Sequence, residues 1–349
     1  MINWVGKKKV DMDIINNKII DCINTKHFTN NGKNVLELQK DLKNIFYIDE
    51  NKEILLTCNG AMGINAIIGG FNIYFEKKLR WAVQSFTFPT SIQGNLNGSL
   101  IFDIDENMGP DIKLLELYKN EYDGLVITNC FGTSVNIELY EKFCHDNNKI
   151  LVFDNAASSM TFYKNKNHIN YGHASMVSLH HTKPIGFGEG GFIIFNKEYL
   201  NSMKKSICFG YTDTNKYEYN IYANNYKMSE IACIYITEYL KNTHNIFKHY
   251  TKIITYFEDK IQYKKYKLYS NFSDNSKSLL STIPVIFDKK VSIDMFLANK
   301  IEAKKYYYPL EYEKHQNSRE LFDNIICLPL NLDIDEKIID KYIDILDKY

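Results

Sequence analysis

A lysine beside a glycine-rich turn is the residue of this sequence whose setting most favours chemistry. Lys183 follows an apolar run at residues 174–179 and precedes glycines at positions 186, 188, 190 and 191. An amine in this position can be partly desolvated, which lowers its pKa and frees its lone pair for Schiff-base formation. The glycines would let the backbone pass close to a bound group. The alternative is an ordinary solvated loop lysine, which this segment alone does not exclude.

An acid stands at the end of another apolar run. Asp154 directly follows Ile150, Leu151, Val152 and Phe153. A carboxylate at the end of a buried strand suits a cationic partner, and the protonated ring nitrogen of pyridoxal phosphate is one such partner. The alternative is an aspartate that caps a following helix.

Two further turns could contact a flat, phosphorylated ligand. The turn at residues 57–63 contains Gly60 and Ala61 and precedes an apolar helical stretch, so its backbone N–H groups and the helix N-terminus favour phosphate. It matches neither the P-loop nor the dinucleotide-binding pattern. Phe88, in the turn at residues 85–90, could stack on a planar ring, although ordinary core packing is the alternative.

A mainly parallel sheet would bring these turns together. Short apolar runs without polar alternation predict strands that are buried on both faces. Helix-sized segments between them predict an α/β domain, in which helices flank the sheet and ligands bind at the carboxyl ends of the strands. The predicted strands are residues 54–58, 79–83, 100–104, 124–128, 150–154, 174–179 and 192–195, and the predicted helices between them include 111–120 and 136–148.

The pattern changes from about residue 228, where helices begin to dominate. This change predicts a smaller α+β domain in the carboxyl-terminal part of the chain. We therefore divide the chain into a large domain of residues 1–235 and a small domain of residues 236–349. The predicted elements of this part are helices at 228–241, 245–264, 292–300 and 336–348 and a strand at 279–287.

The composition excludes several broad classes of function. Lys and Arg together number 42, as do Asp and Glu, so the formal net charge is zero. That balance argues against a protein that binds nucleic acid or a membrane surface. No apolar run is long enough to span a membrane, and no apolar stretch near residue 1 suggests a signal peptide. The 7 cysteines are scattered without Cys-x-x-Cys spacing, so we expect no disulfide and no metal site, and a protein of the reducing cytoplasm.

The motifs occur in an order that resembles a known family. Ser178-Leu-His-His-Thr-Lys183 and Gly188-Glu-Gly-Gly191 are similar to the S-F-H-x-T-K and G-E-G-G motifs of the DegT/DnrJ/EryC1/StrS sugar aminotransferases, which have the fold of aspartate aminotransferase (fold type I). The ordered resemblance spans residues 29–330, which is nearly the whole chain. Further similar segments are Thr29-Asn-Asn-Gly32, Asn225-Tyr-Lys-Met-Ser-Glu230, Tyr307-Tyr-Pro-Leu310 and Cys327-Leu-Pro-Leu330.

The resemblance implies an enzyme that uses pyridoxal phosphate and a role for each residue at the reacting centre. Lys183 would bind the cofactor covalently, and Asp154 would pair with its ring nitrogen. Phe88 would stack on the ring. His180 would lie near the substrate and help to orient it.

The resemblance also implies how the cofactor's phosphate is held. Gly60, Ala61 and the hydroxyl of Ser178 would contact it within one subunit. Asn225 would reach it from the neighbouring subunit, which implies a homodimer with shared active sites. Ala61 replaces the threonine that is usual in the family, and the missing hydroxyl would weaken cofactor binding by roughly 0.5–1.5 kcal/mol.

The reaction that the resemblance implies is a transamination in two half-reactions. Glutamate would give its amino group to the cofactor, and a nucleotide-linked keto sugar would receive it, with Lys183 moving the proton as general acid and base. The expected acceptor is a UDP- or dTDP-linked 4-keto-6-deoxyhexose, which yields a 4-amino-4,6-dideoxy sugar; amination at carbon 3 is the second choice. A non-catalytic, cofactor-binding regulator is a further alternative. Dehydratases of the family carry histidine at the lysine position, so Lys183 argues against that activity.

Overall fold

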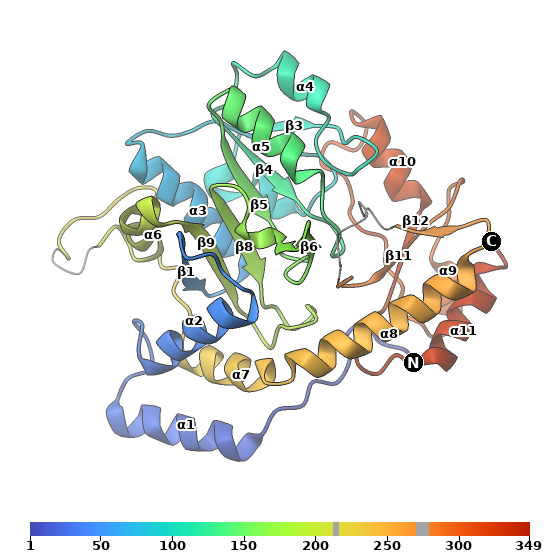
Figure 1. The fold of residues 1–349 in the computed structure, drawn as a ribbon, viewed down its shortest axis with the longest axis horizontal. Helices are drawn as coiled ribbons and strands as arrows, with labels where there is room; N and C mark the ends of the chain where they lie inside the picture. The colour runs from blue at the N-terminus through green and yellow to red at the C-terminus, as the bar shows by residue number, and fades with distance from the viewer. Residues whose placement is uncertain (212–215, 270–278) are drawn as a thin grey trace.

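The computed structural model describes residues 1–211, 216–269 and 279–349, and in these residues a seven-stranded sheet lies at the centre (Figure 1). The strand order is β1-β9-β8-β5-β4-β2-β3. β9 runs antiparallel to both of its neighbours, and the other strands run parallel to one another. The predicted mainly parallel sheet is therefore confirmed. The strands are β1 (Lys52–Thr57), β2 (Trp81–Gln84), β3 (Leu100–Phe102), β4 (Gly124–Thr128), β5 (Ile150–Asp154), β8 (Ala174–Ser178) and β9 (Gly191–Asn196).

The direction of β9 follows from the connection that precedes it. A parallel pair of strands needs a crossover, usually through a helix. Between Ser178 and Gly191 the chain forms turns and no helix, so β9 returns beside β8 with Ser178 opposite Gly191. The turn that carries Lys183 is thus a short link between two paired strands.

Helices cover both faces of the sheet, as predicted. Val152 and Met176 pack toward α3 and α6 on one face. The neighbouring residues Phe153 and Val177 face the other side, where α5 covers one part of the sheet and α2 and α7 cover the rest. The helices of this part are α1 (Met12–Thr25), α2 (Lys33–Ile45), α3 (Gly60–Tyr74), α4 (Ile112–Leu117), α5 (Ile137–Asp146), α6 (Leu200–Ile207) and α7 (Glu230–Leu240), and a small hairpin of β6 (Phe162–Tyr163) and β7 (Lys166–Asn167) follows β5.

The carboxyl-terminal part is the predicted α+β unit. Its antiparallel sheet has the order β10-β11-β12, and α8 packs against α11 beside it (Figure 1). The predicted strand at 279–287 is shorter than expected, and β12 and α10 were not predicted. The proposed domain boundary at residue 235 lies in α7 and stays a prediction. The elements are α8 (Thr243–Ile261), β10 (Lys267–Leu268), β11 (Ile283–Ile286), α9 (Asp294–Ala298), α10 (Gln316–Asn324), β12 (Ile325–Leu328) and α11 (Glu336–Leu346).

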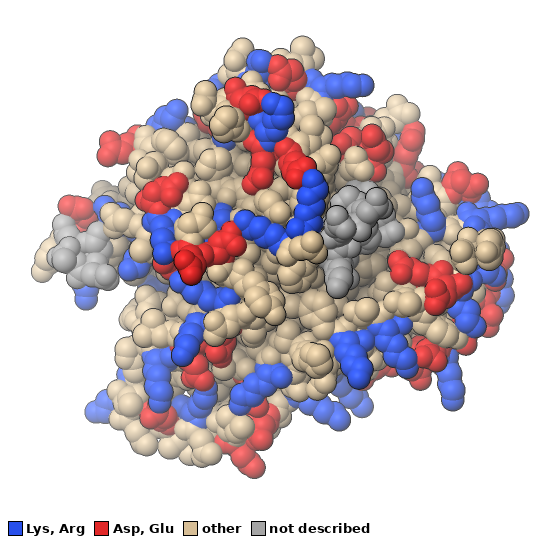
Figure 2. All heavy atoms as spheres, in the orientation of Figure 1, with Lys and Arg blue, Asp and Glu red and all other residues tan. Residues whose placement is uncertain are grey.

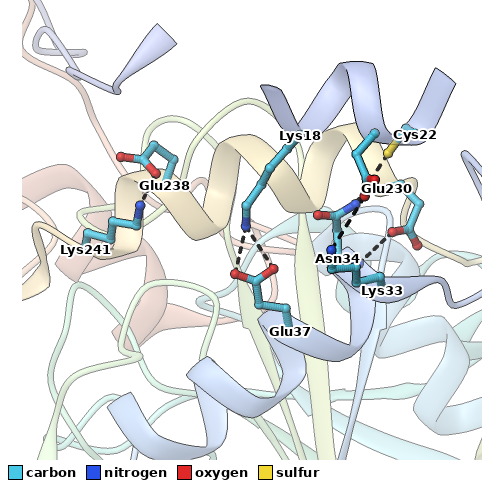
Figure 3. Close-up of polar contacts among 9 residues, drawn as sticks. Lys18, Cys22, Lys33, Asn34, Glu37, Glu230, Glu238 and Lys241 are labelled. Atoms are coloured by element: carbon cyan, nitrogen blue, oxygen red, sulfur yellow. Dashed lines mark hydrogen bonds and ion pairs between the residues drawn. The ribbon is translucent and has the colours of Figure 1, made fainter. Parts of the chain in front are cut away.

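Two helices near the amino terminus, α1 and α2, were not predicted, and polar contacts tie them to α7 (Figure 3). Glu230, the first residue of α7, accepts hydrogen bonds from the backbone N–H groups of Gly32 at 2.7 Å and Asn34 at 2.8 Å. The carboxylate therefore caps the N-terminus of α2, where the first N–H groups have no partner within the helix. Lys18 of α1 pairs with Glu37 of α2 at 2.7 Å. These contacts join two sequence motifs that lie about 200 positions apart, residues 29–32 and 225–230.

Charges are mixed over the surface. On the face drawn in Figure 2, basic and acidic side chains are interspersed, with broad neutral areas between them. This mixture accords with the formal net charge of zero. Among the described residues, no helix combines the length and the apolar character needed to cross a membrane.

Candidate active site

A cavity of about 420 Å³ opens at the carboxyl ends of the parallel strands. It brings together all but one of the residues that the sequence singled out: Lys183, Asp154, His180, Gly60, Ala61, Phe88 and Ser178. The exception, Asn225, lies outside the lining. Thr282, Tyr306 and Tyr307 of the small domain also line the cavity.

Asp154 ends β5 at the floor of this cavity. Its side chain is buried, with 2% of its surface exposed, and one carboxylate oxygen accepts a hydrogen bond from the N–H of Ala156 at 2.9 Å. Burial raises the pKa of Asp154, while the Ala156 N–H and the charge of Lys183 act in the opposite direction. No helix follows β5 directly, so the alternative of a helix-capping aspartate is wrong.

Lys183 lies in the turn between β8 and β9 and also lines the cavity. Burial lowers the pKa of its amine, and the negative charge of Asp154 partly offsets that effect. Lys183 is half-buried and lines the cavity, which argues against the alternative of an ordinary solvated loop lysine. The turn is tight, because the N–H of Lys183 donates to the carbonyl of His180 at 2.8 Å and the N–H of Gly186 donates to the carbonyl of Lys183 at 3.2 Å.

Glycine is required where this turn and β9 pass other backbone. A side chain at Gly186 would collide with the carbonyls of Leu179 and His180. At Gly191, an added Cβ would lie 2.7 Å from the carbonyl carbon of Asn59 and 2.8 Å from the nitrogen of Gly60. Close approach at Gly191 places the end of the Lys183 turn beside the start of α3.

The N-terminus of α3 forms one wall of the cavity. Asn59 caps the helix by accepting a hydrogen bond from the N–H of Met62 at 2.9 Å, and Gly60 and Ala61 form the first turn. N–H groups of a first turn have no acceptor within the helix and carry the positive end of its dipole. Ser178 lies against this turn, since an added Cβ on Gly60 would be 3.0 Å from the Cβ of Ser178. Backbone donors and a hydroxyl thus converge on one corner, which suits an anion.

Aromatic and imidazole rings border the same space. Phe88 lines the cavity with 52% of its surface exposed, so the alternative of core packing is wrong. His180 is held by its own loop: its Nδ1 lies 2.8 Å from the hydroxyl of Thr182, and its Nε2 lies 3.5 Å from the carboxylate of Glu189. These two contacts favour one orientation of the imidazole.

Asn225 is exposed and forms an isolated bridge with Cys208. Its expected contact with the site of a neighbouring subunit stays a prediction.

Several lining residues were missed by the sequence reasoning. Glu189 lies in the motif at residues 188–191, and Tyr307 lies in the motif at residues 307–310. Their positions in these motifs could have identified them as site residues. Trp4 also lines the cavity. It comes from the extended amino-terminal segment, and nothing in the local sequence marks it as a site residue.

Comparison of the sequence with models of known families identifies the family of this chain. The model of the DegT/DnrJ/EryC1/StrS aminotransferase family matches residues 10–347. The chain belongs to this family. The aminotransferase is 22% identical over 341 residues to the dTDP-4-amino-4,6-dideoxy-D-glucose transaminase of Shigella dysenteriae, with 90% of each protein covered. It is 25% identical over 215 residues to the UDP-4-amino-4,6-dideoxy-N-acetyl-beta-L-altrosamine transaminase of Campylobacter jejuni, with 57% of each protein covered.

Comparison of structures gives the same fold. A crystal structure of a proposed PLP-dependent aminotransferase from Bacillus cereus superposes with a TM-score of 0.86 at 21% identity and covers 99% of both chains. The predicted fold class, family, enzyme class and dependence on pyridoxal phosphate are confirmed.

Proposed function

We propose that this aminotransferase moves an amino group from glutamate to a UDP- or dTDP-linked 4-keto-6-deoxyhexose and so forms a 4-amino-4,6-dideoxy sugar. The names of both curated relatives describe transaminases of 4-amino-4,6-dideoxy sugars, one linked to dTDP and one to UDP. They support amination at carbon 4 over carbon 3. The observation that carries the proposal is that Lys183 and Asp154 line one cavity and that the charge of each affects the pKa of the other.

The residues of the cavity fit pyridoxal phosphate. Ser178 and the first turn of α3, at Gly60 and Ala61, offer donors for the phosphate at one corner. Asp154 is buried at the floor, where burial disfavours its charged form, so a protonated ring nitrogen would stabilise the carboxylate. Phe88 is free to cover one face of the ring. The bound cofactor supplies an electron sink for the carbon that loses or gains a proton.

Lys183 is the residue that would transfer protons in the reaction. Because burial lowers the pKa of its amine, more of the neutral base is present at physiological pH than in an exposed lysine. The neutral amine can take a proton from the reacting carbon, and its ammonium form can return one. His180, held by Thr182 and Glu189, would orient the substrate.

The sugar nucleotide would enter from the side of the small domain. Trp4 and Tyr306 line that side of the cavity, with ring centroids 5.6 Å apart, and aromatic rings suit the flat faces of a sugar or a base.

We further propose a homodimer in which Asn225 reaches the partner's phosphate site, and a cytoplasmic location. The proposed domains remain residues 1–235 and 236–349.

The proposal is tested in two stages with purified protein. First, pyridoxal phosphate-loaded enzyme is mixed with glutamate, and formation of pyridoxamine phosphate and 2-oxoglutarate is measured by mass spectrometry. Absence of both products would favour a non-catalytic regulator. Second, the aminated enzyme is mixed with UDP- and dTDP-linked 4-keto and 3-keto 6-deoxyhexoses. A 4-amino product supports the proposal, and a 3-amino product alone would replace it with the second choice.

A further inference from the structure

The amino-terminal segment runs from the small domain to the turn that carries Lys183. Figure 1 shows this segment leaving the small domain near α11 and passing along α7 and α8 to α1. The N–H of Ile2 donates to the carbonyl of Lys300 at 2.8 Å, and the N–H of Trp4 donates to the carboxylate of Glu302 at 2.6 Å. In residues 1–10, the even-numbered positions are less exposed than the odd-numbered ones, as in an extended strand with one face on the protein. Lys8 lies on the covered face.

The ammonium of Lys8 holds both ends of the Lys183 turn. Its Nζ donates to the carbonyl of Lys183 at 2.6 Å and also to the carbonyl of Gly186. Tyr239 supports the same arrangement, since its ring lies 4.7 Å from this Nζ and its hydroxyl donates to the carbonyl of Pro184 at 3.2 Å. The carbonyl oxygens from both ends of the turn therefore meet at one side chain.

Lys8 is an unusual cation for this purpose. Among the described residues, no Asp or Glu affects the pKa of its amine, and burial lowers the pKa of Lys8 to about 7. A buried ammonium without a carboxylate is unfavourable unless its donors are satisfied. Here the carbonyls of Lys183 and Gly186 and the ring of Tyr239 provide the amine with its partners.

We propose that Lys8 is a positioning residue for Lys183. By holding the carbonyls of Lys183 and Gly186, it fixes the backbone from which the Lys183 amine enters the cavity. The inference rests on the proposed function, in which that amine must meet both the cofactor and the reacting carbon. A misplacement of about 1 Å at a reacting group can cost up to roughly 100-fold in rate.

The first test needs no activity. Amide deuterium exchange of the cofactor-free protein is compared between wild type, Lys8→Met and Lys9→Met, in which Lys9 is the exposed neighbour. Methionine keeps most of the unbranched apolar part of the side chain but donates no hydrogen bond. We expect Lys8→Met to speed exchange at residues 183–187 by about 10-fold or more, with little change in β4 and β5, and Lys9→Met to match wild type.

The second test measures the glutamate half-reaction of the same proteins after loading with pyridoxal phosphate, with rates corrected for the loaded fraction. We expect Lys8→Met to lower the maximum rate between about 10-fold and 100-fold, with little change in the half-saturating glutamate concentration and a shifted pH midpoint of the cofactor's visible absorbance. If Lys8→Met does not fold, Lys8→Leu, which also lacks a donor, is judged by the same criteria.

Both effects are required. Any one of three results for Lys8→Met would overturn the proposal. The first is exchange at residues 183–187 equal to that of Lys9→Met, and the second is faster exchange throughout the protein. The third is an unchanged maximum rate. A wild-type enzyme without any half-reaction would instead overturn the proposed function, and the exchange measurement would then still decide whether Lys8 holds the turn.

Discussion

Asp154 and Lys183 reach one cavity from adjacent parallel strands. Asp154 ends β5 opposite Met176 of β8, and Lys183 stands in the turn that follows β8. Burial disfavours the charged form of both side chains. The opposite charge of the partner partly offsets this effect on the pKa of each group. A flat cationic ring between them would complete this arrangement, and the proposed chemistry depends on it.

Replacing the acid should impair turnover more than cofactor binding. Asp154→Asn keeps the shape of the side chain but cannot hold a ring nitrogen in its protonated form. We expect the rate of the glutamate half-reaction to fall by about 100-fold or more, the scale of a lost buried electrostatic partner in an active site. Stopped-flow absorbance measures the rate, and equilibrium titration with pyridoxal phosphate is the control. A near-normal rate would show that another group protonates the ring.

Restoring a hydroxyl at position 61 should strengthen cofactor binding. Ala61 lies in the first turn of α3 and lines the cavity, so a threonine there can donate to the phosphate. We expect Ala61→Thr to improve binding by roughly 0.5–1.5 kcal/mol, measured as the dissociation constant for pyridoxal phosphate. Ala61→Val is the matched control of similar shape without a donor. Equal affinities of the two variants would mean that the hydroxyl makes no such contact.

The strands that position the two residues were predictable because they are short, apolar and buried on both faces. β4 and β5 have the predicted ends. The antiparallel direction of β9 was not predicted, because it depends on whether residues 179–190 form a helix or turns. α2 was missed although Val35, Leu38 and Leu42 recur at helical spacing and are buried, so the signal was present.

Other parts of the site depend on contacts between distant segments. Trp4 lies in an amino-terminal segment that contacts the small domain through the bridge between Ile2 and Ile301. Lys8, in the same segment, contacts the Lys183 turn. Periodicity within a segment reports which face is covered, but it does not report which distant element covers it.

The cap of α2 should contribute more to stability than the neighbouring surface ion pair (Figure 3). Glu230 is buried and accepts from two backbone N–H groups, so Glu230→Gln should lower the free energy of unfolding by about 1–2 kcal/mol. Glu37 pairs with Lys18 at a partly exposed position, and Glu37→Gln should cost less than about 1 kcal/mol. Urea denaturation measures both. The reverse order of the two effects would contradict the capping role.

A buried histidine should make the protein sensitive to acid. His168 begins a short 3-10 helix directly after the β6–β7 hairpin, and burial lowers its pKa from 6.5 to about 4. Between these values the unfolded chain binds the proton and the folded chain does not, so the free energy of unfolding should fall as the pH decreases from 6.5 to 4, by up to roughly 3 kcal/mol.

His168→Gln should flatten this dependence, because glutamine does not titrate. The measurement is the free energy of unfolding in urea at several pH values between 4 and 6.5. His145→Gln is the control, since the side chain of His145 is 89% exposed. A slope for His168→Gln equal to that of wild type would show that other groups cause the acid sensitivity.

Covalent capture of the cofactor tests the central claim most directly. The enzyme is loaded with pyridoxal phosphate, reduced with borohydride, digested and mapped by mass spectrometry. The account predicts a pyridoxyl group on Lys183, and no such label at that position in Lys183→Ala. A label on a different lysine of the wild-type enzyme, with Lys183 unmodified, would contradict it.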